Sequence, residues 1–420
     1  MEANVRRSVR LLTSAQAMNA VGDGSFHVTS ALFLTQVAGL SVAQTGVGLS
    51  IAWGVGFALS TPIGHAADLW GLRRWAVALS ALVAVSLVLA TQVRHDFAFL
   101  AVLTGYAVAQ SGLAAVRQAI VGTVVPPRDR VAVRARLHVA VNTGLGLGAG
   151  LGALVLASGD AWAYAAVFWF DAACFTAGSL LLLLMPAMPG RSDAPRPLTP
   201  FRGGVLRDAP YVTAAALCAV LYLYMPTLTV LLPLFLVRET AAPEWSVAVL
   251  FVINTLGVIA LQMRAAKQVQ DMTTATTGIR RGGLALGAAC LVFAAVALPA
   301  SPMAALLIVC SGAAIQVLGE VLLAAGSWHI GFALADPDRP GQWQGLFASG
   351  LPLARSVGPA FLTFLVLTWS GPGWWVLAAL FASAGVAIGP VARWGERRLT
   401  HPLSGAPGTV RSPQRRSVNR

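Results

Sequence analysis

Five charged side chains lie inside long apolar runs of the chain, where water cannot solvate them. They are Asp23, Arg117, Asp171, Glu320 and Arg355. A charge placed inside a bilayer costs about 3 kcal/mol on insertion scales, so each of these residues needs a partner or a task. A carboxyl group in this setting can bind and release a proton, and an arginine can neutralise it.

The residues around Asp23 form a polar face on one predicted helix. They recur at spacings of three or four and comprise Gln16, Asn19, Asp23, His27 and Ser30. This spacing gathers them on one side of a helix, and a polar stripe across a bilayer predicts a wet cavity. We expect Asp23 to carry a proton or to meet the substrate, with a buried structural carboxylate as the alternative. His27 could relay protons or simply hydrogen-bond to Asp23.

Glu320 is the second acid that we expect to serve proton coupling or substrate binding. Gln316 precedes it by one helical turn, and Arg355 on the neighbouring helix is expected to neutralise it. Packing of Glu320 against a hydroxyl group is the alternative. Asp171 is expected to be structural.

Arg117 lies nearer one end of its apolar run. It could anchor a loop through Asp129 or Asp68, or it could take part in function. We keep both interpretations open and count Arg117 among the candidate site residues.

The composition shows what kind of element must hold these side chains. Of the 420 residues, 57% are hydrophobic and only 11% are charged, whereas an ordinary globular protein has roughly 25% charged residues. So few charges could not cover the surface of a soluble protein of this length. Lipid must therefore be the solvent for much of the chain, and the net charge of +13 is better explained by membrane orientation than by nucleic-acid binding.

A membrane-spanning helix needs about 20 mostly apolar residues, and about twelve such runs follow one another here. Their predicted limits are 11–37, 45–66, 75–93, 97–123, 137–158, 162–185, 210–236, 245–264, 282–299, 304–333, 345–369 and 373–392. A stretch rich in Pro, Gly and Arg separates six runs from six. We therefore predict a six-helix bundle over 1–185, a cytoplasmic linker over 186–208, a second bundle over 209–394 and a disordered cytoplasmic tail over 395–420.

The basic residues predict the orientation. Of the 29 bases, Arg94 and Arg238 fall on one side, Arg117 and Arg355 fall within helices, and the others fall on the side of the two termini. Because Lys and Arg gather in cytoplasmic loops, both termini are expected in the cytoplasm of a multi-pass protein of a bacterial cytoplasmic membrane.

The two predicted bundles also align weakly with each other. At one constant offset, Pro127 falls on Pro337, Gly148 on Gly358 and Gln110 on Glu320. Together with the division of the helices, this predicts related halves with a substrate site between them near the membrane midplane. Gln110 therefore joins the candidate site.

The loop after the second predicted helix carries a motif. It has Gly64, Asp68 and Gly71 followed by Arg73 and Arg74. Glycines permit a tight turn and close helix approach, and Asp68 can accept hydrogen bonds near a helix N-terminus. Here the sequence resembles the major facilitator superfamily, whose signature G-x-x-x-D-x-x-G-x-[RK]-[RK] falls in the same loop. The resemblance implies that the loop latches against the other half, and that the first and fourth helices of each half line the cavity.

The fifth predicted helix carries Gly144, Gly148 and Gly152, a spacing that lets two helices pack with their backbones in contact. It also resembles the family's antiporter motif, g-x-x-x-G-P-x-x-G-G, which is typical of exporters. Ala149 stands where that motif has Pro, and Ala153 replaces its last Gly.

From the resemblance we expect a proton-coupled exporter of a small amphipathic compound, a drug or a metabolite, that works by alternating access as a monomer. A sugar or amino-acid uptake permease of the same fold is the alternative. A membrane enzyme would need a nucleophile with a base or a metal set, and the sequence has no HExxH or GxSxG motif. We therefore expect no enzyme, metal or other cofactor, although a sensor that does not transport remains an alternative. The substrate cannot be read from the sequence.

Overall fold

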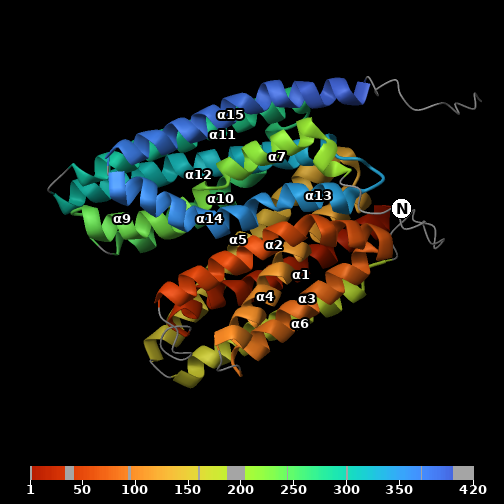
Figure 1. The fold of residues 1–420 in the computed structure, drawn as a ribbon, viewed down its shortest axis with the longest axis horizontal. Coiled ribbons are helices and arrows are strands. Elements are labelled where there is room, and N and C mark those ends of the chain that lie inside the picture. Colours follow the sequence, from red (N-terminus) through yellow and green to blue (C-terminus); the bar gives the residue numbers. More distant parts are fainter. Residues whose placement is uncertain are drawn as a thin grey trace, which may run out of the picture.

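The computed structural model describes residues 2–33, 42–92, 96–158, 161–186, 204–243, 245–298, 301–369 and 371–400. Throughout these ranges the regular structure is helical, with no β-strand (Figure 1). The predicted all-α membrane fold is confirmed.

The first half of the chain contains six long helices. They are α1 (Glu2–Leu32), α2 (Val42–Trp70), α3 (Leu72–Ala90), α4 (Asp96–Val124), α5 (Arg130–Ser158) and α6 (Ala161–Leu183). A short 3-10 turn, Pro127–Asp129, joins α4 to α5.

The described part of the second half contains four helices of 23 residues or more and several shorter segments. They are α7 (Ala209–Leu221), α8 (Tyr224–Pro226), α9 (Leu232–Glu239), α10 (Ser246–Gln268), α11 (Met272–Ala294), α12 (Pro302–Ala333), α13 (Pro340–Ala348), α14 (Gly350–Thr363) and α15 (Gly371–Thr400). A π-helical turn, Thr227–Leu231, links α8 to α9, and another, Phe364–Thr368, follows α14. The segments α7 to α9 thus form one candidate span, and α13 and α14 form another.

In the described part of the chain, eleven helical segments are long and apolar enough to cross a membrane. Helix α1 is not among them, although it is 31 residues long. Its arginines and the polar face around Asp23 lower its hydropathy, yet α1 packs along both α5 and α6. Together with α1, these segments account for the twelve predicted spans.

Three helices begin well before the predicted membrane-spanning runs that they contain. The helices predicted from 11, 137 and 282 begin at Glu2, Arg130 and Met272. Each missed segment contains arginines, which lower the local hydropathy without interrupting a helix, since Arg is a good helix former. Arg134, which the prediction placed in a loop, therefore lies in α5.

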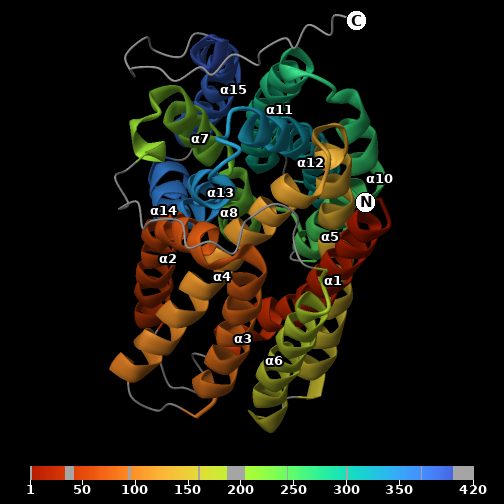
Figure 2. The same ribbon diagram turned by 90° about the vertical axis from the view of Figure 1, so that its right-hand side faces the viewer.

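The two halves of the chain form two groups of helices (Figure 2). In the first, α1 packs on α5 and α6, and α4 packs on α2 and α3; in the second, α11 packs on α12 and α15. The exact limits of the predicted domains stay a prediction, and most of the predicted linker and tail, 187–203 and 401–420, lies outside the described residues.

We call the end of the molecule that carries Arg6, Arg73, Arg128, Lys267 and Arg398 the basic end. The two halves meet at the basic end. At the opposite end, the start of α2 in the first half and α9 in the second half lie apart, as Figure 1 shows. At the basic end, α13 packs between α2 and α4 of the first half, and α10 packs on α5.

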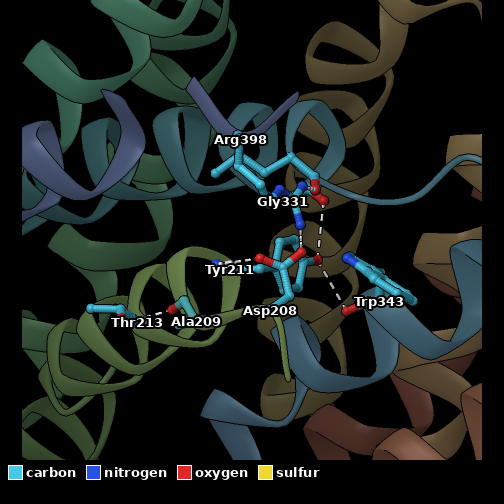
Figure 3. A network of polar contacts seen from close by, with 8 residues as sticks. Asp208, Ala209, Tyr211, Thr213, Gly331, Trp343 and Arg398 are labelled. Carbon is cyan, nitrogen blue, oxygen red and sulfur yellow. Dashed lines mark hydrogen bonds and ion pairs between the residues drawn. The ribbon is translucent and has the colours of Figure 1, made fainter. Parts of the chain in front are cut away.

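A polar network holds the second half together at this end (Figure 3). Arg398 of α15 forms an ion pair with Asp208, whose side chain also accepts a hydrogen bond from the Tyr211 backbone N–H, 3.3 Å, and so caps α7. The Tyr211 hydroxyl lies 3.2 Å from the carbonyl oxygen of Gly331 and 3.0 Å from that of Trp343. The network joins α7, α12, α13 and α15 into one unit.

Candidate functional site

Asp23 lies in the middle of α1 and is half-buried among polar and aromatic side chains of α4. Gln110 donates a hydrogen bond from Nε2 to Asp23 Oδ1, 2.9 Å, and the Tyr106 hydroxyl lies 3.5 Å from the same oxygen. Gln110 also donates to the Tyr106 hydroxyl, 3.1 Å. Two side chains one helical turn apart on α4 therefore hold one oxygen of this carboxyl group.

Asn19 and Arg117 continue the polar contacts between α1 and α4. With the Asn19 amide oriented to satisfy its neighbours, its oxygen accepts a hydrogen bond from Arg117 and its nitrogen donates to the carbonyl oxygens of Ala15 and Cys174. Arg117 is 9% exposed and also acts electrostatically on Asp23. Arg117 thus faces the interior of its own half, and among the described residues no contact joins it to Asp129 or Asp68.

Arg355 brings a positive charge from the second half to Asp23. It lies on α14, with its guanidinium 4.5 Å from the centre of the Trp53 ring of α2, and it acts electrostatically on Asp23. Its expected pairing with Glu320 was wrong, since the groups acting on Glu320 are Asn254 and Tyr224. The side chain crosses the interface between the halves.

His27 lies one turn beyond Asp23, and its side chain is exposed. Its Nδ1 lies 2.5 Å from the main-chain carbonyl oxygen of Asp23, so this nitrogen donates along the helix. The ring also acts electrostatically on the Asp23 carboxyl group. His27 thus hydrogen-bonds to the main chain of Asp23, and whether it relays protons stays a prediction.

Glu320 forms a second polar site in the other half. It is 4% exposed on α12, and Asn254 of α10 donates a hydrogen bond to its Oε2, 2.7 Å. The Tyr224 hydroxyl of α8 also hydrogen-bonds to Glu320. Gln316, one turn earlier, is buried, and its Nε2 has no hydrogen-bond partner in the described part of the chain. Neutral groups from two other elements, α8 and α10, thus hydrogen-bond to this carboxyl group.

The loop motif contacts the second half directly. Asp68 accepts hydrogen bonds from the backbone N–H groups of Gly341, 2.8 Å, and Gln342, 2.9 Å, at the first turn of α13. A carboxylate at a helix N-terminus is favoured by these unpaired N–H groups and by the helix dipole. Gly64 of α2 packs so closely on Gly341 of α13 that a Cβ at either glycine would collide with the backbone of the other.

The rest of the motif shapes the turn between α2 and α3. Gly71 has a φ of 102°, a left-handed conformation that favours glycine. Arg73 donates from Nη1 to the carbonyl oxygen of Met185 after α6, 2.7 Å, whereas Arg74 is exposed. The motif therefore contacts α13 of the second half through Asp68 and the end of α6 through Arg73, while its role as a latch stays a prediction.

The glycines of α5 bring this helix against the backbone of α1. A Cβ at Gly144, Gly148 or Gly152 would collide with the backbone of α1, whereas a Cβ at Gly150 would meet nothing within 4 Å. The predicted close packing of two helices is therefore present, and its partner is the helix that carries Asp23.

Several residues at the interface were missed from the sequence. His138 of α5 lies 2.9 Å from Gln262 Oε1 of α10, and Gln118 of α4 donates to Gln344 of α13, 2.6 Å. Single amide side chains in apolar helices were the available signal, but the sequence did not show which of them face the other half.

A cavity of about 770 Å³ lies at the basic end. It opens between the start of α1 and the connection from α4 to α5, and its lining includes Arg6, Arg10, Asp129 and Arg136. None of the predicted site residues lines it, so its volume gives no support to their roles.

Comparisons with known proteins agree with this architecture. The family model described as Major Facilitator Superfamily matches residues 12–359. A comparison with the curated proteins found no match.

Solved structures of transporters share the fold at low sequence identity. The human organic anion transporter TETRAN is 16% identical with a TM-score of 0.69, and 91% of this chain and 99% of that one are covered. The Escherichia coli fucose:proton symporter FucP is 15% identical with a TM-score of 0.69, covering 92% and 98%. A bacterial homologue of the iron transporter ferroportin in an outward-facing state is 14% identical with a TM-score of 0.71, covering 93% and 99%.

These likenesses support the fold, and the family model covers most of the chain. A protein of this family and fold is a secondary transporter that works by alternating access, and the comparisons point to a transporter and not to an enzyme. The chain belongs to the major facilitator superfamily.

Proposed function

We propose that the protein is a proton-coupled exporter of a small amphipathic compound, a drug or a metabolite. The observation that carries the proposal is the position of Asp23 between Gln110 of its own half and Arg355 of the other half. A proton on Asp23 would remove its charge and with it the attraction to Arg355. Proton binding would thereby weaken a contact between the halves, which is the equilibrium that alternating access requires.

Asp68 supplies the complementary contact at the basic end. Its hydrogen bonds to Gly341 and Gln342 are formed in the structure, so the state described here is closed at that end. We propose that these bonds break when the protein opens there, and that Glu320 provides a second site for coupling or substrate binding in the other half. Glu320 is enclosed by Asn254 and Tyr224, which suits either role.

The resemblance of the α5 glycines Gly144, Gly148 and Gly152 to the family's antiporter motif supports export as the direction. These glycines of α5 pack on the backbone of α1, which carries Asp23. Because the two helices are in close contact, a movement of one must displace the other. Uptake of a metabolite is the second candidate, and the structural likeness to a fucose:proton symporter favours it. Both candidates share the proton site and differ in direction.

We further propose that the protein acts as a monomer in the bacterial cytoplasmic membrane with both termini in the cytoplasm. The orientation is supported by the basic residues at the end where α1 begins and α15 ends. Reporter fusions at each terminus and in the connection between α9 and α10 would test this orientation, because only the last should report the opposite side.

The function itself is tested in two steps. Growth of a host that lacks its own efflux pumps, with and without expression, is measured across a panel of antibiotics and dyes. A compound that expression protects against is then followed in everted vesicles with an acidic interior. The proposal predicts proton-driven accumulation inside these vesicles. Accumulation of labelled metabolite by intact cells, with no protection in the panel, would instead establish uptake.

A further inference from the structure

Arg134 stands out because it is a guanidinium inside the interface with no acidic partner among the described residues. It lies in the second turn of α5, with its guanidinium 5.2 Å from the centre of the Trp328 ring of α12. Its Nε is closed off from solvent and has no hydrogen-bond partner among the described residues. Within the same residues, no carboxylate contributes to its electrostatic environment, in which Tyr222 is the favourable group.

The neighbouring charges make this position less favourable still. Arg117 of α4 and Arg134 act on each other as like charges, and His138 lies one turn further along α5. The charge of Asp23 compensates that of Arg117, whereas none of the described acids compensates Arg134. A cation held in a low-dielectric interior without compensation destabilises the protein, so an anion from outside the chain would be bound favourably.

The groups around Arg134 would suit an organic anion with a flat apolar part. The His138 and Trp328 rings pack edge to face with centroids 5.5 Å apart, and the Trp328 face already stacks on the guanidinium. The Tyr222 hydroxyl and Ser327 Oγ lie 3.3 Å apart on the other side of the interface. An arginine offers a planar fork of donors to a carboxylate, and the aromatic rings offer apolar contact beside it.

We propose that Arg134, Trp328 and Tyr222 bind the anionic group of the transported compound, so that the substrate is an organic anion with a flat apolar body. This inference rests on the proposed function and narrows its substrate class. The site joins α5 of one half to α12 and to Tyr222, directly after α7, of the other. It lies toward the basic end, so the compound would enter it from the side that the proposed orientation makes cytoplasmic.

Equilibrium binding to the purified protein tests this inference without a gradient or a direction of transport. The probes are 1-naphthoate, its neutral carboxamide and cationic 1-naphthylmethylamine, measured on protein in phosphatidylcholine nanodiscs. We expect naphthoate to bind at least tenfold more tightly than either relative, since a hydrogen bond to a charged group commonly contributes about a factor of ten or more. Equal binding of all three probes would overturn the proposal.

Variants locate the site. Arg134→Gln should weaken naphthoate binding at least tenfold, and Arg134→Lys should weaken it less because the charge is kept. Arg136→Gln is the matched control, since Arg136 is exposed and lies two residues along the same helix. Each variant is first checked for a monodisperse size-exclusion profile. If Arg134→Gln does not give one, the conclusion is drawn from Arg134→Lys. Naphthoate affinity unchanged in the Arg134 variants, or reduced equally in the control, would contradict the assignment.

A lipid headgroup is the other source of an anion at this depth. Repeating the measurement in nanodiscs with added phosphatidylglycerol distinguishes a lipid from a substrate. A headgroup bound at Arg134 would weaken naphthoate binding to the parent protein, and this weakening would be absent in Arg134→Gln. Such competition would overturn the assignment to substrate. The binding test does not depend on transport, because binding is measured at equilibrium. If the protein binds naphthoate but proves to be uncoupled or an importer, the proposed export is refuted and this site is not.

Discussion

The guanidinium of Arg355 lies 4.5 Å from the centre of the Trp53 ring, and the two side chains come from opposite halves of the protein. Trp53 packs edge to face on Tyr106, with centroids 6.4 Å apart, and the Tyr106 hydroxyl approaches Asp23. Trp53 and Tyr106 thus hold the guanidinium of Arg355 close enough to act electrostatically on the carboxyl group of Asp23. The contact between halves and the charge of Asp23 are therefore physically connected.

The hydrogen bonds of Asp68 predict how the basic end opens. Asp68→Asn removes the negative charge that two N–H groups and the α13 dipole favour, so the open state should gain at least tenfold in population. Fluorescent labels on cysteines at Arg128 and Lys267, both exposed and in opposite halves, would report a longer distance, with the native cysteines replaced. Glu239→Gln, an exposed acid at the opposite end, is the charge-matched control. An unchanged distance in Asp68→Asn would contradict the latch.

The packing of α5 on α1 predicts opposite results at two neighbouring glycines. Gly148→Ala places a Cβ against the Val21 backbone, where neither helix can yield, and should lower the melting temperature in detergent. Gly150→Ala meets nothing within 4 Å and replaces a poor helix former, so it should leave the melting temperature unchanged or raise it. Equal effects of the two substitutions would mean that the close approach does not matter for stability.

Asp171 of α6 is 0% exposed, and both of its carboxyl oxygens lack a hydrogen-bond partner in the described residues. It packs on Gly22, beside Asp23. Because a buried unpaired carboxyl group is unfavourable, Asp171→Asn should keep or raise the melting temperature. Asp208→Asn, which breaks the ion pair with Arg398, should lower it. A large loss of stability in Asp171→Asn would show that this acid has a partner and a structural task.

The sequence predicted the site where a local pattern was enough. The spacing of Asn19, Asp23 and His27 placed them on one helix face, and the alignment of the halves brought in Gln110, which binds Asp23. It did not predict the partner of Arg355, because that depends on how two surfaces distant in the sequence pack together. It also missed Arg134, since the hydropathy pattern started the fifth helix after this residue, although the basic turn is helical.

The central claim, that Asp23 couples a proton to the movement of the halves, is tested most directly by the distance between labels at Arg128 and Lys267 as the pH is lowered from about 8 to about 5. The account predicts a shift in the distance distribution that is present in the parent protein and in Glu239→Gln but absent in Asp23→Asn. The same shift in Asp23→Asn as in the parent would contradict it.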